Sequence, residues 1–253
     1  MIGAIAGAII GSRFEGHPAP PADFELFHPH CRVTDDTVCL LAVADAILRR
    51  DDFAETLRRF VRRHPDAGYG GMFIDWAMSP GASAYGSWGN GAPMRTVAAG
   101  WIAKDVDDVD KLAARQAIVS HNHPDAVRAA QAVSRAIFDL RHGKSVENVR
   151  HETERTFGYD LRPGVAFISG GFDVSAAGTV PLHWRRLSIR EIGTKRYAQS
   201  CCSEATTDTL ACIAGAVAEA IHGVPVSVAE QARAHLSQDL LEVLVRFDKA
   251  VAR

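Results

Sequence analysis

The sequence lacks the features that mark membrane-spanning, secreted and nucleic-acid-binding proteins. No apolar stretch reaches the roughly 18 residues that a membrane-spanning helix needs. No basic residues precede the apolar stretch 1–11, so we expect no signal peptide. A formal net charge of -2, from 28 Lys and Arg against 30 Asp and Glu, provides no electrostatic basis for nucleic-acid binding. We therefore expect a cytoplasmic protein that binds neither membranes nor nucleic acids.

The cysteines lack the spacing of a zinc or redox motif. There are five, and no two of them form a CxxC pair. An odd number of cysteines without an export signal is typical of free thiols in a reducing compartment. Buried cysteine is common as a small apolar residue, so we do not expect a cysteine nucleophile. These residues are Cys31, Cys39, Cys201, Cys202 and Cys212.

Strand signals are also scarce, being weak and confined to 165–179. With 253 residues, 47% of them hydrophobic, the chain can form one sizeable core. Linkers and internal repeats are absent, so we expect a single all-α domain over 1–253. Apolar residues at helical spacing predict helices at 4–10, 38–50, 53–63, 95–104, 111–120, 126–141, 146–157, 210–222, 226–234 and 238–251.

Two short acidic runs, 34–37 (TDDT) and 207–209 (TDT), stand where predicted helices begin. Thr and Asp suit the first turn of any helix, because their oxygens accept unpaired N–H groups and the positive end of the helix dipole favours carboxylates. Helix capping is sufficient to explain either run alone. Two such runs together also supply the hard oxygen ligands that Mg²⁺, Ca²⁺ or Mn²⁺ prefers. The pair therefore predicts a site for two ions between two helix N-termini.

Three loops carry further candidate residues. A glycine-rich loop, 87–95, leads into a helix and could cradle a phosphate, although a plain turn has the same composition. The loop 120–125 contains His121 and His123, which could contact a ligand or cap a helix. Glu15 follows the first predicted helix, where a Glu is usually a solvated loop residue.

Taken together, these segments resemble the ADP-ribosylglycohydrolase family. The matching pieces, in family order, are GAIAGAIIGSRFEG, TDDT, GYGGMFIDW, YGSWGNGAPMR, SHNHPDAVRAAQA, FGYDL and TDTLACIAGAVAEA. The resemblance implies a compact orthogonal multi-helix bundle with a centre of two Mg²⁺ or Mn²⁺ ions. It also implies hydrolysis of the glycosidic bond between ADP-ribose and a protein side chain or small molecule. We expect a monomer, and the sequence carries no decodable signal for the acceptor.

The resemblance assigns roles residue by residue. Ligands of the first ion would be Thr34, Asp35 and Asp36. Asp208 would bridge the ions, and Thr209 and Glu15 would belong to the second. Either Glu15 or Asp36 would act as the catalytic base. The substrate would be held by Ser87, Gly89, Asn90, Gly91 and His121, with Asp75 near the leaving group.

One segment, 183–206, departs from the family pattern. The second metal motif of the family usually has an Asp at the position of Thr206. The residues before it, HWRRLSIREIGTKRYAQSCCSEAT, have poor helical periodicity where the family has an amphipathic helix. Plausible codons for this segment, read one nucleotide earlier, give ALAASIDSRDWDEAVRAIVLLGGD. That alternative restores the helix and the missing Asp, so we hypothesise two compensating single-base shifts in the gene or in its sequencing.

Two other functions fit parts of the sequence. An ADP-ribose-binding or structural protein of the same fold is compatible with the loss of an Asp at Thr206. An unrelated all-helical phosphohydrolase could use His121, His123 and Asp125, although the second His–Asp pair of such a site is absent. Release of free ADP-ribose distinguishes the enzyme from the first alternative. Activity on a generic phosphoester distinguishes it from the second.

Overall fold

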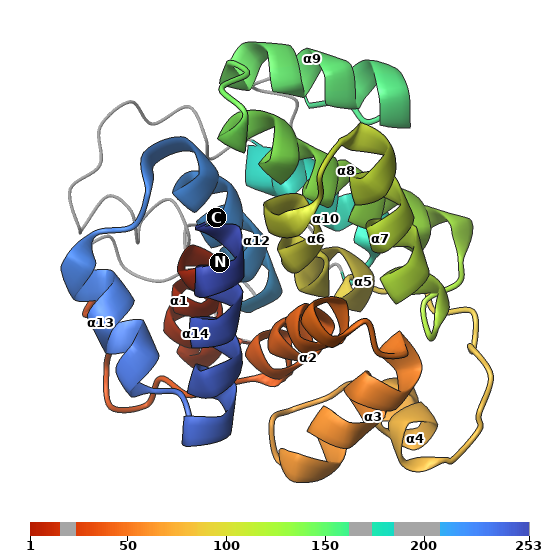
Figure 1. The fold of residues 1–253 in the computed structure, drawn as a ribbon, viewed down its shortest axis with the longest axis vertical. Helices are drawn as coiled ribbons and strands as arrows, with labels where there is room; N and C mark the ends of the chain where they lie inside the picture. Colours follow the sequence, from red (N-terminus) through yellow and green to blue (C-terminus); the bar gives the residue numbers. More distant parts are fainter. Residues whose placement is uncertain (16–23, 162–173, 185–207, 253) are drawn as a thin grey trace.

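The structure, a computed structural model, describes residues 1–15, 24–161, 174–184 and 208–252, and Figure 1 shows their arrangement. Regular elements in these ranges are helices, with one isolated antiparallel bridge between Gly89 and Ser175. The all-α prediction is therefore confirmed. None of the described helices is long and apolar enough to cross a membrane.

Two helices from opposite ends of the chain form the centre of one half of the fold. They are α1 (Ile2–Gly11) and α12 (Asp208–His222), which pack along each other. A Cβ on Gly7 would lie 2.0 Å from the carbonyl oxygen of Ala211, and a Cβ on Gly215 would lie 2.2 Å from that of Gly3. Only glycine permits this backbone approach. Two further helices flank the pair: α13 (Val226–Ala234) packs on α1, and α14 (Gln238–Val251) packs on α2 (Asp35–Arg49).

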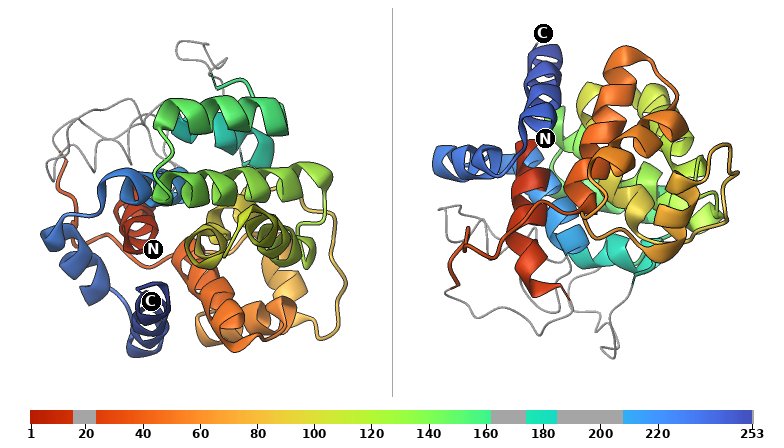
Figure 2. Two further views of the ribbon diagram at one scale, coloured as in Figure 1. Left: turned by 45° about the horizontal axis from the view of Figure 1, so that its top comes forward. Right: turned by 90° about the horizontal axis from the view of Figure 1, so that it is seen from below.

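The other half is built around α8 (Pro124–Arg141), the longest described helix (Figure 2). Its neighbours are α5 (Gly91–Arg95), α6 (Val97–Ile102), α7 (Val106–Ile118), α9 (Val146–Phe157) and α10 (Ala176–Trp184). Helix α2 joins the two halves by contacting α1, α5 and α12, and α3 (Phe53–Arg63) and α4 (Gly71–Met78) extend from it. A short 3-10 helix, η1 (Ser12–Phe14), continues α1.

Most predicted helices are confirmed, four of them at their predicted bounds (53–63, 146–157, 226–234 and 238–251). The predicted helix 95–104 is instead two helices, α5 and α6, which meet at Thr96. The strand signal is wrong for 176–179, which begin helix α10, while 165–173 lie outside the described residues. Within 176–179 the β-branched Thr179 favours a strand, but it is buried where α10 packs on α8 and α12. Helix α4 was not predicted.

Candidate active site

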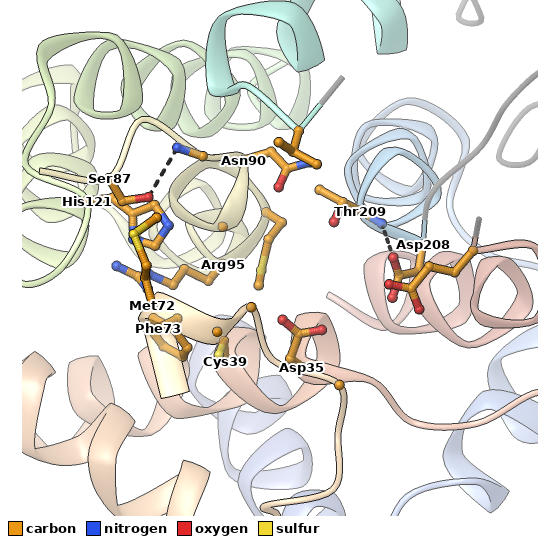
Figure 3. A pocket seen from close by; sticks show the side chains of 18 of the residues that line it. Asp35, Cys39, Met72, Phe73, Ser87, Asn90, Arg95, His121, Asp208 and Thr209 are labelled. Atoms are coloured by element: carbon orange, nitrogen blue, oxygen red, sulfur yellow. Dashed lines mark hydrogen bonds between the residues drawn. The ribbon is translucent and has the colours of Figure 1, made fainter. Parts of the chain in front are cut away.

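A cavity of about 350 Å³ is lined by residues of α2, α4, α5 and α12 and by the loops next to them. Figure 3 shows Asp35, Asp208 and Thr209 on one side of it and Ser87, Arg95 and His121 on the other. The two sides differ in chemistry, and we call them the carboxylate end and the cradle end. Cavities of this size accommodate part or all of a small organic ligand.

Two helix N-termini supply the carboxylate end. Asp35 and Asp36 form the first turn of α2, and Asp208 begins α12. The α-carbon of Asp208 would lie only 2.9 Å from a Cβ on Gly11, so the close packing of α1 against α12 also sets the position of this carboxylate. The acidic runs predicted to converge are thus brought to one cavity from positions over 170 residues apart.

Asp208 is buried and Asp35 is half-buried at the cavity, and Asp36 is buried beside them without lining it. Burial and the neighbouring Asp208 raise the pKa of Asp35 and of Asp36 well above the ordinary value. Burial and Glu15 raise the pKa of Asp208 to about 6. The Thr209 hydroxyl donates to Oδ1 of Asp36 at 3.2 Å, while Oδ2 of Asp36 is buried without a hydrogen-bond partner. Such clustering of anions costs free energy that a bound cation would offset.

Thr34 stands at the N-cap of α2, but its side chain makes no capping hydrogen bond. Asp52, Asp105 and Ser145, at the N-caps of α3, α7 and α9, each accept a backbone N–H in the usual way. The Thr34 hydroxyl is buried and has no hydrogen-bond partner among the described residues. It lies near Asp208 and partly offsets the rise in the pKa of that carboxyl. Helix capping alone therefore does not account for Thr34.

Glu15 lies at the mouth of the carboxylate end, directly after η1. Its side chain is 42% exposed, and its Oε2 lies 3.3 Å from Nη2 of Arg32. A weak, solvent-screened ion pair of this kind leaves the carboxylate able to exchange partners.

The donor set fits a hard divalent cation. It consists of buried carboxylate and hydroxyl oxygens, including the unpartnered Oδ2 of Asp36. Within the described residues, no three His, Cys, Asp or Glu side chains have the spacing of a ready metal site. The carboxylates would thus have to draw closer around an ion. Thr206 and Thr207 lie outside the described residues, and metal binding stays a prediction.

The cradle end is formed by the loop before α5 and by His121. The backbone N–H of Gly89 donates to the Ser87 hydroxyl at 3.2 Å, and the N–H of Asn90 donates to the Val174 carbonyl at 2.8 Å. Helix α5 begins at Gly91, where a Cβ would lie 3.0 Å from Nε2 of His121. All four predicted loop residues and His121 line the cavity. Their contact with a ligand stays a prediction.

Other candidate residues do not reach the cavity. Asp75 is exposed on α4 and is not among the residues that line it, because α4 turns this side chain to the surface. His123 caps α8, with its Nδ1 accepting from the N–H of Asp125 at 3.2 Å. His121, His123 and Asp125 therefore form no joint metal site among the described residues, which removes the structural basis of the phosphohydrolase alternative.

Several lining residues were not assigned a role from the sequence: Cys39, Met72, Phe73, Tyr85 and Arg95. Cys39 lies one helical turn after Asp35 and so shares its helix face. Burial raises the pKa of its thiol well above the usual value, so the group is a neutral wall residue. Arg95, 1% exposed, is the last residue of the glycine-rich loop 87–95. Its place in that loop was the sequence signal that could have identified it as a site residue.

Known proteins resemble this chain in sequence and in fold. A family model described as ADP-ribosylglycohydrolase matches residues 1–190. An ADP-ribosylhydrolase ARH3 from Xenopus tropicalis is 25% identical over 151 residues, which span 48% of this chain and 43% of that protein. A solved structure described as an ADP-ribosylglycohydrolase-related protein complex matches with a TM-score of 0.68 and 19% identity. That match covers 99% of this chain and 97% of the other, and it shows the fold alone.

The two kinds of match end at different places. The family match in sequence stops at residue 190, inside the segment 183–206 that departs from the family pattern. The likeness in structure extends over nearly the whole chain. The fold therefore continues past residue 190, where the match to the family model ends.

Proposed function

Because the chain belongs to the ADP-ribosylglycohydrolase family, we propose that it hydrolyses the glycosidic bond between ADP-ribose and an acceptor, with two Mg²⁺ or Mn²⁺ ions as cofactors. The observation that carries this proposal is a single cavity with buried carboxylates at one end and a glycine-rich cradle at the other. The aligned part of the curated relative is less than half of its length, so the acceptor is not transferred from it. The acceptor would be a protein side chain or a small molecule, and the substrate would be its ADP-ribosylated form.

The proposed roles follow from the two ends. Bound divalent ions would supply Lewis-acid polarisation of the ribose hydroxyls and of a water molecule. Thr34, Asp35, Asp36 and Asp208, together with Thr209 and Glu15, would hold them. Asp36 or Glu15 would accept the proton from the attacking water or from a ribose hydroxyl. Negative charge at this end also stabilises an oxocarbenium-like transition state.

At the opposite end, the cradle would hold the diphosphate and its ribose. Gly89 and Gly91 let the backbone approach phosphate oxygens closely, and Ser87, Asn90 and His121 offer polar side-chain groups. Under this proposal, the scissile bond would lie toward the carboxylates, where proton transfer is needed.

The test is release of free ADP-ribose from ADP-ribosyl-arginine and ADP-ribosyl-serine peptides, assayed with Mg²⁺, with Mn²⁺ and with a chelator. We expect slow release with metal and none with chelator, because Thr206 replaces a charged ligand of the second ion. An Asp107→Asn variant loses a single charge at an exposed carboxylate on α7. It is the control for any variant that loses one of the carboxylates at the carboxylate end.

A second candidate function follows from Thr206. If the second ion is not held, the chain would bind ADP-ribose without cleaving it. Tight ADP-ribose binding with no release under any metal condition would favour this alternative. Neither binding nor release would refute both functions.

A further inference from the structure

A buried hydrogen-bond network lies directly behind the cradle end. Nε of Arg95 donates to Oε1 of Gln116 at 2.7 Å, and Nη2 donates to the Gln116 carbonyl at 2.8 Å and to the Ser120 hydroxyl at 2.9 Å. The amide nitrogen of Gln116 donates in turn to the carbonyls of Ala92 and Ala113. Arg95, Gln116 and Ser120 are each at most 1% exposed, so solvent does not compete for these bonds.

This network determines which way the Ser120 hydroxyl points. A guanidinium can only donate, so the Ser120 oxygen must accept from Arg95. The remaining polar neighbour of that oxygen among the described residues is Nδ1 of His121, at 2.8 Å. A buried hydroxyl proton without an acceptor is costly, and donation to Nδ1 is the arrangement that avoids this cost.

The other ring nitrogen of His121, Nε2, lies at the cavity. Nε2 of His121 forms no hydrogen bond within the described part of the chain, and the nearest backbone is that of Gly91 and Gly89. A Cβ would come within 3.0 Å of Nε2 at Gly91 and 3.7 Å at Gly89. The two glycines therefore keep free the space next to this nitrogen.

We propose that Arg95 and Ser120 are positioning residues that hold His121 as the neutral imidazole with its proton on Nε2. His121 then acts as a hydrogen-bond donor, and the ligand atom beside Gly91 must be an acceptor. This last step rests on the proposed function, under which the acceptor is a phosphate oxygen of ADP-ribose.

The charge distribution supports an anionic acceptor at this place. Arg95 forms no ion pair with a carboxylate in the described ranges, so no described residue neutralises its buried charge. Burial lowers the pKa of Arg95 to about 10, which leaves it charged at pH 7. Burial and this nearby cation lower the pKa of His121 well below its usual value, so the imidazole is neutral. A neutral donor in front of a buried cation suits an anionic oxygen.

The tautomer can be read without any ligand. Long-range ¹H–¹⁵N spectra of the histidine-labelled protein distinguish the Nε2–H from the Nδ1–H form, and a His121→Gln variant assigns the signal. We expect the Nε2–H form at pH 7 in the unaltered chain and a loss of that preference in Ser120→Ala. Ser120→Thr, which keeps a hydroxyl, should restore it. Ser134→Ala, which removes an equally buried hydroxyl bonded to Ala130 instead, should leave it unchanged.

Binding of ADP-ribose gives the second measurement. Ser120→Ala should weaken the affinity about 10-fold, as expected for loss of one well-oriented hydrogen bond, whereas Ser134→Ala should not. A charged or Nδ1–H ring in the unaltered chain, or an unchanged tautomer in Ser120→Ala, would overturn the proposal. If ADP-ribose does not bind at all, the proposed function fails, and the ligand-free spectra still decide the tautomer.

Discussion

Arg95 lines the cavity, and Asp36 is buried beside its carboxylate end, where the Thr209 hydroxyl donates to it. The two are opposite kinds of buried charge. The guanidinium is held by neutral groups, and the carboxylate lies among other carboxylates. Both arrangements are costly in the empty protein, because a desolvated charge needs a counter-charge. A ligand that carries cations at one end and anions at the other would neutralise both. Each residue therefore indicates the charge of what binds next to it.

At Asp36, we predict that activity and stability respond in opposite directions. Asp36→Asn removes one of several neighbouring buried charges, so the metal-free protein should become more stable, by about 1 kcal/mol or more. The same change should abolish any metal-dependent release of ADP-ribose, because it removes a ligand and candidate base. Thermal unfolding in chelator and the release assay measure the two effects. A lower melting temperature in chelator would contradict the view that these charges repel.

Among the elements, α2 has two tasks. Its N-terminus brings Asp35 to the cavity and buries Asp36 beside it, and the helix also packs on α3 and α14. Asp45, 4% exposed, links these helices, because it forms ion pairs with Arg49 on α2, Arg59 on α3 and Arg246 on α14. One carboxylate thereby links three helices, and the orientation of the site-bearing helix depends on it.

We predict that Asp45→Asn destabilises the fold by about 2 kcal/mol, since hydrogen bonds to charged groups are lost. Burial alone would raise the pKa of Asp45, but the hydrogen bonds from Arg49 and Arg246 outweigh it and lower that pKa. A depressed pKa means that the stabilisation is present above about pH 4, the unfolded value, and is lost as the pH falls through the folded value. Urea unfolding between pH 7 and pH 3 measures this.

The difference in the free energy of unfolding between the unaltered chain and Asp45→Asn should therefore become smaller below about pH 4. Asp107→Asn, at an exposed i,i+4 pair with Lys111, is the matched control and should change stability by at most about 0.5 kcal/mol. A difference that stays constant down to pH 3 would show that the charge of Asp45 is not the source of the effect.

The contact between α1 and α12 makes a separate prediction. Gly7→Ala should destabilise the protein by about 2 kcal/mol, because its Cβ meets the Ala211 carbonyl at 2.0 Å and forces the helices apart. Gly70→Ala is the control, since its Cβ meets nothing within 4 Å and its φ of -60° suits alanine. Equal stability of the two variants in thermal unfolding would refute the close packing.

For the whole molecule, the site depends on segments that are far apart in sequence. Asp208 comes from near the end of the chain, Asp35 and Asp36 from near its beginning, and the cradle from the middle. The segment before Asp208 departs from the family pattern, and it lies mostly outside the described residues.

We predict that replacing 183–206 by ALAASIDSRDWDEAVRAIVLLGGD increases both thermal stability and the rate of ADP-ribose release. The replacement removes basic residues that are costly to bury unpaired and supplies an Asp at position 206. Thr206→Asp alone should restore only part of the activity, because it adds the ligand without the helix. If the replacement improves neither quantity, the hypothesis of two frame shifts is wrong and Thr206 is a tolerated ligand variant.

The sequence by itself determined the helical class and most helix positions. Helical spacing of apolar residues is a local property, so 53–63 and 238–251 were predicted at their observed bounds. The short acidic and glycine-rich runs also contain about half of the lining residues of the cavity, because their residue types suit ions and phosphates. Family likeness assigned their roles, and the sequence did not establish those roles independently.

Only the tertiary structure decided which of these residues share a space. Residues 176–179 belong to helix α10 despite a strand signal in the sequence, because the β-branched residues of this helix are buried between other helices. Asp75 was turned to the surface by α4, and Arg95 was placed behind His121 by the packing of α5 against α7 and α8. Burial, hydrogen-bond partners and pKa shifts depend on neighbours that are distant in sequence, and no local pattern encodes them.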